Sequence, residues 1–278
     1  MAEQTTLDPL RGGQTSRYAQ RTLALVYLAV LVLVPIVVIT YKTFDAGWST
    51  FWTAVSSSTA VTAYRLTLEV AISAVVINAV FGVGLALLIT RYRFPGRRVL
   101  GALADLPLSV SPIVVGLALI LVYGPVGGWF GPGLQSAGFK VIYALPGMIM
   151  ATAFVSLPLI MREVVPVLHE AGTDQEQAAR VLGASAWQSF RRITLPTIRP
   201  ALTYGIVLSF ARSIGEYGAV KVVSGNISGV GQTATVPLVI GNEVDQLQQG
   251  YYQLAFLLIL VTVTAITVVS FKRREESP

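Results

Sequence analysis

Two opposite charges interrupt a long apolar stretch in the C-terminal third of the chain. Arg212 and Glu216 stand one helical turn apart there, and Ser209 and Ser213 fall on the same helical stripe. Inside a bilayer an unpaired charge costs on the order of 3 kcal/mol or more, so these side chains must face one another, a neighbouring helix or a water-filled path. The chemistry they offer is charge pairing and hydrogen bonding to a polar solute rather than bond cleavage.

Two interpretations of this stripe are open. The first places it on a translocation path or on a moving interface between two membrane subunits, and the second treats it as a fixed structural ion pair. Arg212 precedes Glu216, which is the less favourable order for pairing within one helix, so a partner on another helix is favoured. Because the pair is neutral in sum, it is not assigned to binding an anion.

A second group of polar residues is a candidate for lining a path. Ser109, Ser111 and Pro112 follow one another closely at the start of an apolar run. Within a helix a proline frees a backbone carbonyl, and serine hydroxyls supply hydrogen bonds inside a bundle. Serines that only pack helices together explain these residues almost as well.

Several classes of site are excluded by residue type. The chain has no Cys and one His, His169, so thiolate metal sites, Cys nucleophiles and multi-His metal clusters cannot form. It also lacks the Gly-Lys-Ser or Gly-Lys-Thr of a phosphate-binding loop. We therefore expect no cofactor or metal on this chain and no catalysis by it, and any work from ATP must come from elsewhere.

The elements that must position these residues are membrane helices. Of the 278 residues, 54% are hydrophobic and 12% are charged, with a mean hydropathy of +0.67, whereas soluble domains carry about 25% charged residues. An uncharged stretch such as that between Arg21 and Lys42 is long enough to cross a hydrocarbon core of about 30 Å. The pattern predicts an all-α polytopic membrane protein with six transmembrane helices. We place the spans at about 21–42, 69–91, from 105 onward, 141–161, 201–223 and 254–271.

The distribution of Lys and Arg predicts the orientation. Most of them lie in alternate segments, which by the positive-inside rule face the cytoplasm. Both termini are therefore expected in the cytoplasm, as tails of residues 1–20 and 272–278 around a membrane domain of 21–271. The basic residues of these segments are Arg11, Arg17, Arg21, Arg91, Arg93, Arg97, Arg98, Arg162, Arg180, Arg191, Arg192, Arg199, Lys272, Arg273 and Arg274.

The cytoplasmic connection at 162–199 is longer than a bundle needs. Residues 173–176 and 185–188 each have the pattern of a capping box, which predicts one helix starting near Asp174 and a second after Ser185. Gly183 fits the left-handed residue that ends the first helix, and Pro196 is expected to end the second. The segment is either a docking element for another protein or a pair of amphipathic helices lying on the lipid surface. A DNA-reading helix-turn-helix has a similar pattern, but membrane spans on both sides exclude access to nucleic acid.

The run QAARVLGASAWQSFRRITLP resembles the signature of binding-protein-dependent ABC importer permeases. That signature has two small residues, three arbitrary ones, a Gly, nine more residues, and Ile-x-Leu-Pro. The matching positions are Ala178, Ala179, Gly183, Ile193, Leu195 and Pro196. The sequence departs from the family at the acidic position before the two alanines, which is Gln177 here, with Glu176 next to it. A salt bridge from Gln177 to an ATPase is therefore not expected.

The resemblance implies a function. In this family the loop inserts into a groove on a separate ATP-hydrolysing subunit, and ATP and Mg²⁺ are bound there. The segments RYRFPGRR, DLPLSVSPIVVGLAL and ARSIGEYGAVKVVSG look like the sulfate and molybdate branch, and the Val222–Gly225 segment looks like sulfate permease subunits of the CysW type. The similarity covers about residues 60–270.

The resemblance also implies partners and a location. They are a CysT-type sister permease in a heterodimer, two ATP-binding subunits, an extracytoplasmic sulfate-binding protein and the lipid bilayer of the cell membrane. Imported sulfate or thiosulfate would cross by alternating access. A molybdate or tungstate permease, usually a homodimer, remains an alternative within the branch, and a secondary anion carrier remains one of a different class.

Overall fold

The computed structural model describes residues 14–225 and 250–276, and all regular structure within them is helical. The all-α prediction is confirmed for this part of the chain. The helices are α1 (Gln14–Phe44), α2 (Trp48–Val55), α3 (Ser58–Arg91), α4 (Arg97–Ser109), α5 (Pro112–Tyr123), α6 (Gly131–Ser136), α7 (Leu145–Ala171), α8 (Asp174–Val181), α9 (Ala186–Ser189), the π-helix η1 (Phe190–Thr194), α10 (Leu195–Ile214), α11 (Gly218–Val223) and α13 (Gly250–Glu276).

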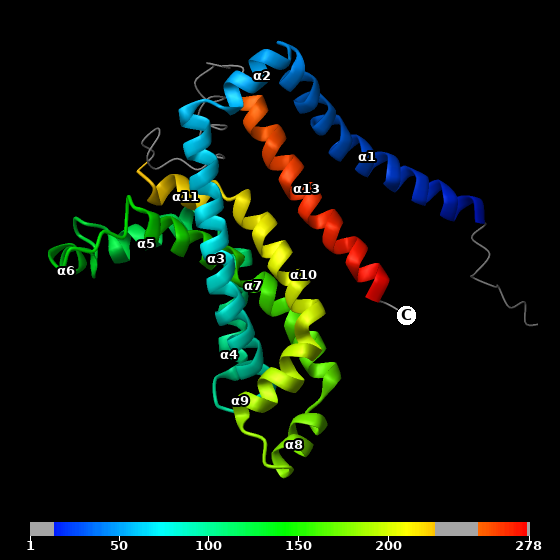
Figure 1. Cartoon of the computed structure of the whole chain (residues 1–278), viewed down its shortest axis with the longest axis vertical. Coiled ribbons are helices and arrows are strands. Elements are labelled where there is room, and N and C mark those ends of the chain that lie inside the picture. Colours follow the sequence, from blue (N-terminus) through cyan, green and yellow to red (C-terminus); the bar gives the residue numbers. More distant parts are fainter. Residues whose placement is uncertain (1–13, 226–249, 277–278) are drawn as a thin grey trace, which may run out of the picture.

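A bundle of α3, α7 and α10 forms the centre of the molecule (Figure 1). Close approach between these helices depends on two glycines. A Cβ atom added to Gly82 of α3 would lie 3.1 Å from Cγ2 of Ile160, and one added to Gly205 of α10 would lie 3.0 Å from the Cα of the same residue. Small residues at such crossings let membrane helices pack by van der Waals contact. Ile160 of α7 is consequently fully buried between the two neighbours.

Three described helices are long and apolar enough to cross a bilayer, and they lie in α1, α3 and α7. The helices α4 and α5 pass the same test together but meet at an angle of 113°. A shorter apolar segment, Ala255–Thr267, lies in α13. The predicted spans at 21–42, 69–91 and 141–161 overlap α1, α3 and α7, and the third overlaps the bent pair of α4 and α5. The predicted fifth and sixth spans fall on α10 with α11 and on α13, which are not among the described helices that pass this test, so the total of six stays a prediction.

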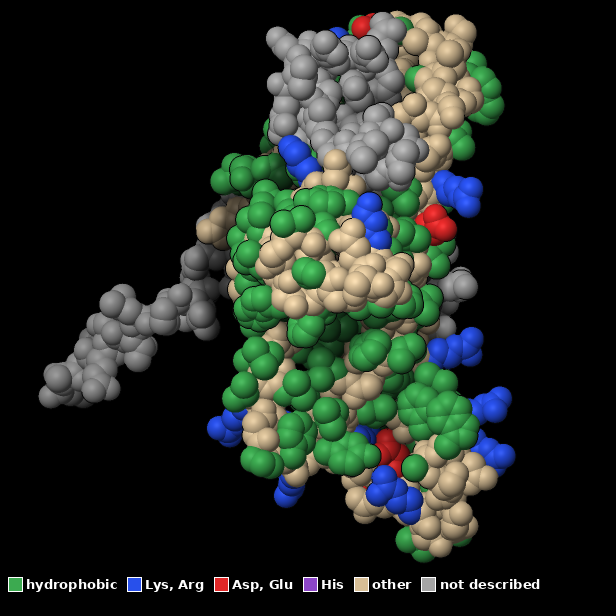
Figure 2. Space-filling model, turned by 90° about the vertical axis from the view of Figure 1, so that its left-hand side faces the viewer, with side chains coloured by type: hydrophobic (Ala, Val, Ile, Leu, Met, Phe, Trp, Pro, Cys, Tyr) green, Lys and Arg blue, Asp and Glu red, His purple; other side chains and the backbone are tan. Residues whose placement is uncertain are grey.

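The surface of the molecule separates apolar and basic regions. On the face drawn in Figure 2, hydrophobic side chains cover much of the middle, and Lys and Arg are concentrated around the end that carries α8 and α9. The membrane-spanning window of α1 is not buried at all by the rest of the chain. A helix that is apolar on every side requires lipid or another membrane protein around it.

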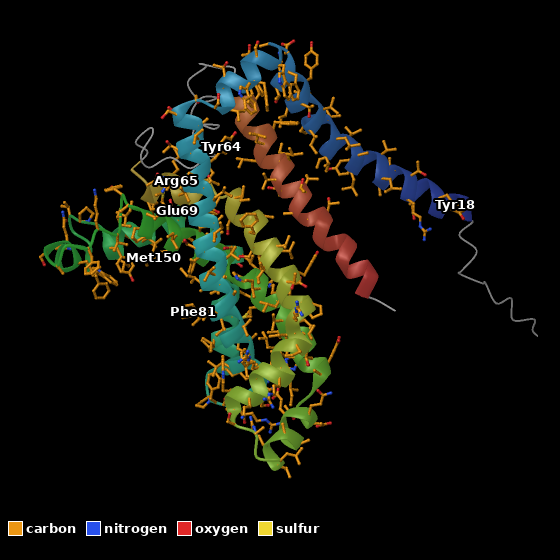
Figure 3. All side chains as sticks on the ribbon, in the orientation of Figure 1. Tyr18, Tyr64, Arg65, Glu69, Phe81 and Met150 are labelled. Carbon is orange, nitrogen blue, oxygen red and sulfur yellow. The ribbon has the colours of Figure 1, made fainter. Side chains whose placement is uncertain are left out.

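The second span begins earlier than expected. The sequence analysis placed its start at Glu69, whereas α3 begins at Ser58, capped by Ser57, whose Oγ accepts a hydrogen bond from the N–H of Ala60. Figure 3 shows Arg65 and Glu69 projecting from the body of α3. Both are exposed, so charges on one side of the helix interrupted the apolar run without ending the helix.

The third and fifth spans are broken, which the sequence analysis did not predict. Pro112 begins α5, and Ser111 before it is extended (φ −59°, ψ 133°), because the proline ring disfavours a helical conformation there. In the fifth span α10 ends at Ile214, and α11 begins at Gly218. The expectation that Pro112 frees a carbonyl inside a helix is therefore wrong, since proline at the first helical position removes no helical hydrogen bond.

The two half-helices α5 and α11 pack tightly against each other, and we expect Gly116→Ala to disturb them. A Cβ at Gly116 would lie 2.8 Å from Cβ of Val222 and 3.0 Å from the carbonyl oxygen of Ala219, and a backbone oxygen cannot move aside. The expected loss is about 1–3 kcal/mol of unfolding free energy, measured as a lower melting temperature in detergent. In the control Gly84→Ala, the new methyl group meets nothing within 4 Å, so stability should be unchanged or slightly higher. Equal melting temperatures for the two variants would contradict the packing argument.

Candidate functional site

The helix α8 starts at Asp174 as predicted, but its predicted capping box is absent. The Thr173 side chain makes no capping hydrogen bond. It accepts instead a hydrogen bond of 2.8 Å from the side-chain amide of Gln177. Glu176, which would have reached back to Thr173, is turned toward the membrane bundle. The prediction was wrong because a tertiary partner competes with the local cap.

That tertiary partner is Arg91, the last residue of α3. Its Nε lies 3.1 Å and its Nη2 3.2 Å from the two carboxylate oxygens of Glu176. The third nitrogen, Nη1, donates to the carbonyl oxygen of Leu168 in α7 at 2.8 Å. The Thr194 hydroxyl donates to the same carboxylate at 2.8 Å. This group, the Arg91–Glu176 link, joins α8 to α3, α7 and η1.

The turn after α8 and the cap of the next helix are confirmed. Gly183 has φ +84°, the left-handed conformation expected of a residue that ends a helix. The N–H of Ala184 donates to the carbonyl of Ala179 at 2.9 Å, which closes the turn. Ser185 and Gln188 form the reciprocal capping box, with hydrogen bonds of 3.2 and 2.8 Å. Local sequence was sufficient here because every partner lies within a few residues.

Pro196 does not end the second helix, contrary to prediction. The chain continues through η1 directly into α10, with Pro196 in the first turn of α10. In η1 the N–H of Leu195 bonds to the carbonyl of Phe190, five residues back. The wider π-helical turn accommodates a proline that has no N–H to donate. Residues 173–194 are termed the coupling segment after the role that the family resemblance implies, and their second helix therefore runs into α10 without a break.

The outermost part of this segment is apolar and exposed. Val181 is 89% exposed, Leu182 87% and Trp187 67%, and these three residues are termed the apolar tip. The Trp187 ring stacks on Phe190 at 5.5 Å, which holds it in place. Large apolar side chains exposed at the end of a membrane protein indicate a surface that another protein or the lipid headgroups cover. Val181 and Leu182 were not identified from the sequence, because they occupy arbitrary positions between Ala179 and Gly183 of the family signature.

The remaining motif residues surround the tip. Gln177 and Ala178 are exposed and Ala179 is half-buried on α8. In the second helix Ile193 and Leu195 are half-buried and face the bundle side, where Leu195 packs near the buried Ile198. The predicted coupling residues are thus divided between an outward surface and the support behind it.

Arg212 and Glu216 pair with each other. Nη1 of Arg212 lies 2.7 Å from Oε2 of Glu216, whose side chain is 2% exposed, and Oε1 of Glu216 accepts the N–H of Ala219 at 2.9 Å. Arg212 therefore pairs with Glu216 itself, whereas the residue order had favoured a partner on another helix. That rule applies within a helix, whereas α10 ends at Ile214 and Glu216 lies in the break.

The two serines of the stripe belong to a buried polar cluster. Asn78 of α3 donates to Ser156 of α7 at 2.8 Å and lies 3.5 Å from the hydroxyl of Ser209. The Ser213 hydroxyl donates to Ser156 at 3.2 Å, and Ser156 donates to the carbonyl of Thr152. The cluster ties α3, α7 and α10 together. Sequence reasoning missed Asn78 and Ser156, although an Asn within an apolar stretch was an available signal.

The serines of the third span lie at its bend. Ser109 and Ser111 are exposed and Pro112 is half-buried. A Cβ added to Gly218 would lie 3.2 Å from Cβ of Pro112, so the break between α4 and α5 touches the start of α11. The structure therefore brings the two broken spans together, with Glu216 close by in sequence. Their assignment to a translocation path or a subunit interface stays a prediction.

Among the described residues no group of three or more His, Asp or Glu side chains is arranged to hold a metal ion. Of the charged side chains described above, Arg91 is paired with Glu176 and Arg212 with Glu216. The arrangement can therefore support docking and movement of helices, and its chemistry is that of hydrogen bonds and ion pairs.

Comparison with known proteins adds to this geometry. Residues 78–273 match the family model described as "Binding-protein-dependent transport system inner membrane component". The sulfate transport system permease protein CysW of Synechococcus elongatus is 43% identical over 237 residues, which cover 85% of this chain and 82% of that protein. The permease protein CysT of Escherichia coli is 37% identical over 248 residues, or 89% of this chain and 87% of that protein.

The fold is similar to that of a solved transporter. A bacterial ABC transporter involved in the import of the acidic polysaccharide alginate has a chain that superposes with a TM-score of 0.77. The match covers 94% of this chain and 96% of that chain, at 15% sequence identity.

Proposed function

Since the chain belongs to the family of binding-protein-dependent transport system inner membrane components, we propose that it is a permease subunit of an ATP-driven importer that carries sulfate or thiosulfate into the cytoplasm. The substrate follows from the similarity to CysW and CysT proteins, both of which are sulfate transport system permeases. The chain itself breaks no bond in this proposal. ATP and Mg²⁺ are bound by two separate ATP-binding subunits.

The observation that carries this proposal is the apolar tip on a rigid support. Val181 and Leu182 are almost fully exposed at the end of the molecule that is rich in Lys and Arg. Basic residues mark the cytoplasmic side, where ATP-hydrolysing subunits are found. Because the turn at Gly183 and the helix into α10 are held by hydrogen bonds, force applied at the tip can move the fifth span.

The assembly we propose contains a CysT-type sister permease, two ATPases and an external sulfate-binding protein. The membrane-spanning window of α1, which the rest of the chain leaves unburied, supports a membrane assembly, because such a helix needs further apolar surroundings. Closure of the ATPases would draw the coupling segments together and open the path outward, and hydrolysis would reset it inward. Both termini would then face the cytoplasm.

Reconstitution in vesicles tests this function. The chain is combined with the candidate sister permease, ATPase and sulfate-binding protein, and uptake of labelled sulfate is measured with molybdate as a competitor. We expect uptake that requires ATP and all four components and resists molybdate. Uptake without the ATPase would instead indicate a secondary carrier. If uptake needed no sister permease and were suppressed by molybdate, the chain would be a molybdate permease.

A further inference from the structure

The helix α8, which ends at Val181 of the apolar tip, has few backbone contacts with the membrane bundle. It follows α7 through Gly172 and Thr173, and Gly172 has φ +62°, so this connection is a turn rather than a continuous helix. The backbone of α8 otherwise approaches mainly α9 and η1. A force on α8 therefore needs another route to reach the first half of the bundle.

We infer that the Arg91–Glu176 link is this route, and that Arg91 is a positioning residue through which movement of α8 displaces α3. This inference rests on the proposed function. Its basis is that a side chain from the last turn of α3 holds α8 directly, at 3.1 Å between Nε and the carboxylate. One guanidinium group also holds the carbonyl of Leu168 at 2.8 Å, so α3, α7 and α8 meet on a single planar group.

The surroundings make the link stiff. Both side chains are only 12% exposed, so water screens their attraction little. The guanidinium approaches the carboxylate through two nitrogens, a geometry that fixes direction as well as distance, and lysine cannot reproduce it. The adjacent cavity has a volume of about 10 Å³, enough for at most one water molecule. Rotation of α8 relative to α3 must therefore break the link or carry α3 along.

The link also explains a departure from the family signature. The acidic residue expected before the two alanines is replaced by Gln177, which is exposed, and Glu176 is turned inward. In this chain the carboxylate of Glu176 serves contact within the subunit, whereas Asp174, Gln177 and the apolar tip are the exposed groups that remain for docking of the ATPase.

The experiment is a double-mutant cycle in the reconstituted complex. The variants are Arg91→Met, Glu176→Gln, the double variant and Arg91→Lys, and the readouts are sulfate taken up per ATP hydrolysed and the amount of ATPase that co-purifies. We expect each single variant to keep ATPase binding and hydrolysis but to lose roughly 10-fold in uptake per ATP. The double variant should lose no more than either single one, because both remove the same link. Arg91→Lys should have an uptake per ATP between those of Arg91→Met and the unaltered complex, because lysine keeps the charge but not the two-nitrogen geometry.

A second ion pair provides the matched control. Arg162 of α7 lies 2.9 Å from Asp105 of α4, with side chains 55% and 42% exposed, so this pair joins α7 to α4 rather than to α8. We expect Arg162→Met to leave uptake per ATP within about twofold, as exposed pairs contribute little.

Three outcomes would overturn the inference. They are unchanged uptake per ATP in Arg91→Met and Glu176→Gln, multiplied losses in the double variant, and loss of ATPase binding in proportion to lost uptake. The last would mean that the link only supports docking. Failure of the proposed function is separate, since it would appear as ATPase-independent uptake by the unaltered complex.

Discussion

Replacing Leu182 by Asp is expected to abolish ATPase-dependent uptake. The Leu182 side chain is 87% exposed, so the change should not affect the stability of this chain. In the assembled transporter the new carboxylate would lie unpaired in an apolar contact between subunits, which lowers the affinity of that contact. We expect at least a roughly 100-fold loss of ATPase association, equivalent to about 3 kcal/mol. Co-purification of the ATPase and uptake in vesicles measure it.

The control places the same charge on another exposed aliphatic residue. Val126, between α5 and α6, is 92% exposed and lies outside the coupling segment. Val126→Asp should leave ATPase association unchanged. If Leu182→Asp bound the ATPase as well as Val126→Asp does, the apolar tip would not be the docking surface.

Replacing Glu216 by Ala is expected to destabilise the subunit strongly. The carboxylate is buried, pairs with Arg212 at 2.7 Å and accepts the N–H of Ala219 at 2.9 Å. Its loss leaves the buried N–H of Ala219 and the guanidinium of Arg212, which is 38% exposed, without this partner, at a cost of about 1–3 kcal/mol in unfolding free energy. The melting temperature in detergent and the level of folded protein in membranes are the measurements.

Related variants separate the contributions. Glu216→Gln retains an acceptor for the N–H of Ala219 and should lower the unfolding free energy less than Glu216→Ala does. The double variant Arg212→Ala, Glu216→Ala should be more stable than Glu216→Ala alone, because no charge is left unpaired. Glu69→Ala removes an exposed carboxylate from α3 and should change stability by about 0.5 kcal/mol at most. If Glu216→Ala were as stable as Glu69→Ala, the pair would not hold the break between α10 and α11.

Helix boundaries were predictable where the signal was local. Gly183 and the Ser185–Gln188 box were identified correctly because their partners lie within one turn. Breaks within apolar runs were not. The bend of 113° between α4 and α5 occurs in a sequence whose hydropathy is continuous, and hydropathy does not indicate direction. The start of α3 was misplaced for the converse reason, since the charge of Glu69 interrupts the apolar run whereas the helix continues past it to Ser58.

The candidate site shows the same division. Sequence identified the stripe of Ser209, Arg212 and Ser213, because residue type and spacing within one helix indicate which side chains face the same way. Glu216 was assigned to the same stripe, although it lies beyond the end of α10. It missed Asn78 and Ser156, whose role appears only when α3 and α7 pack beside α10.

By itself, the sequence determined that this is an all-helical membrane protein with a turn-and-helix segment resembling that of ABC importer permeases. Composition, helix period and capping are short-range properties, and a reader of the chain can evaluate them one turn at a time. The partners of Arg91 and Glu176 could be identified only from the way in which α3, α7 and α8 pack together. An ion pair depends on the distance between charged groups in space, and that distance is set by how the helices pack.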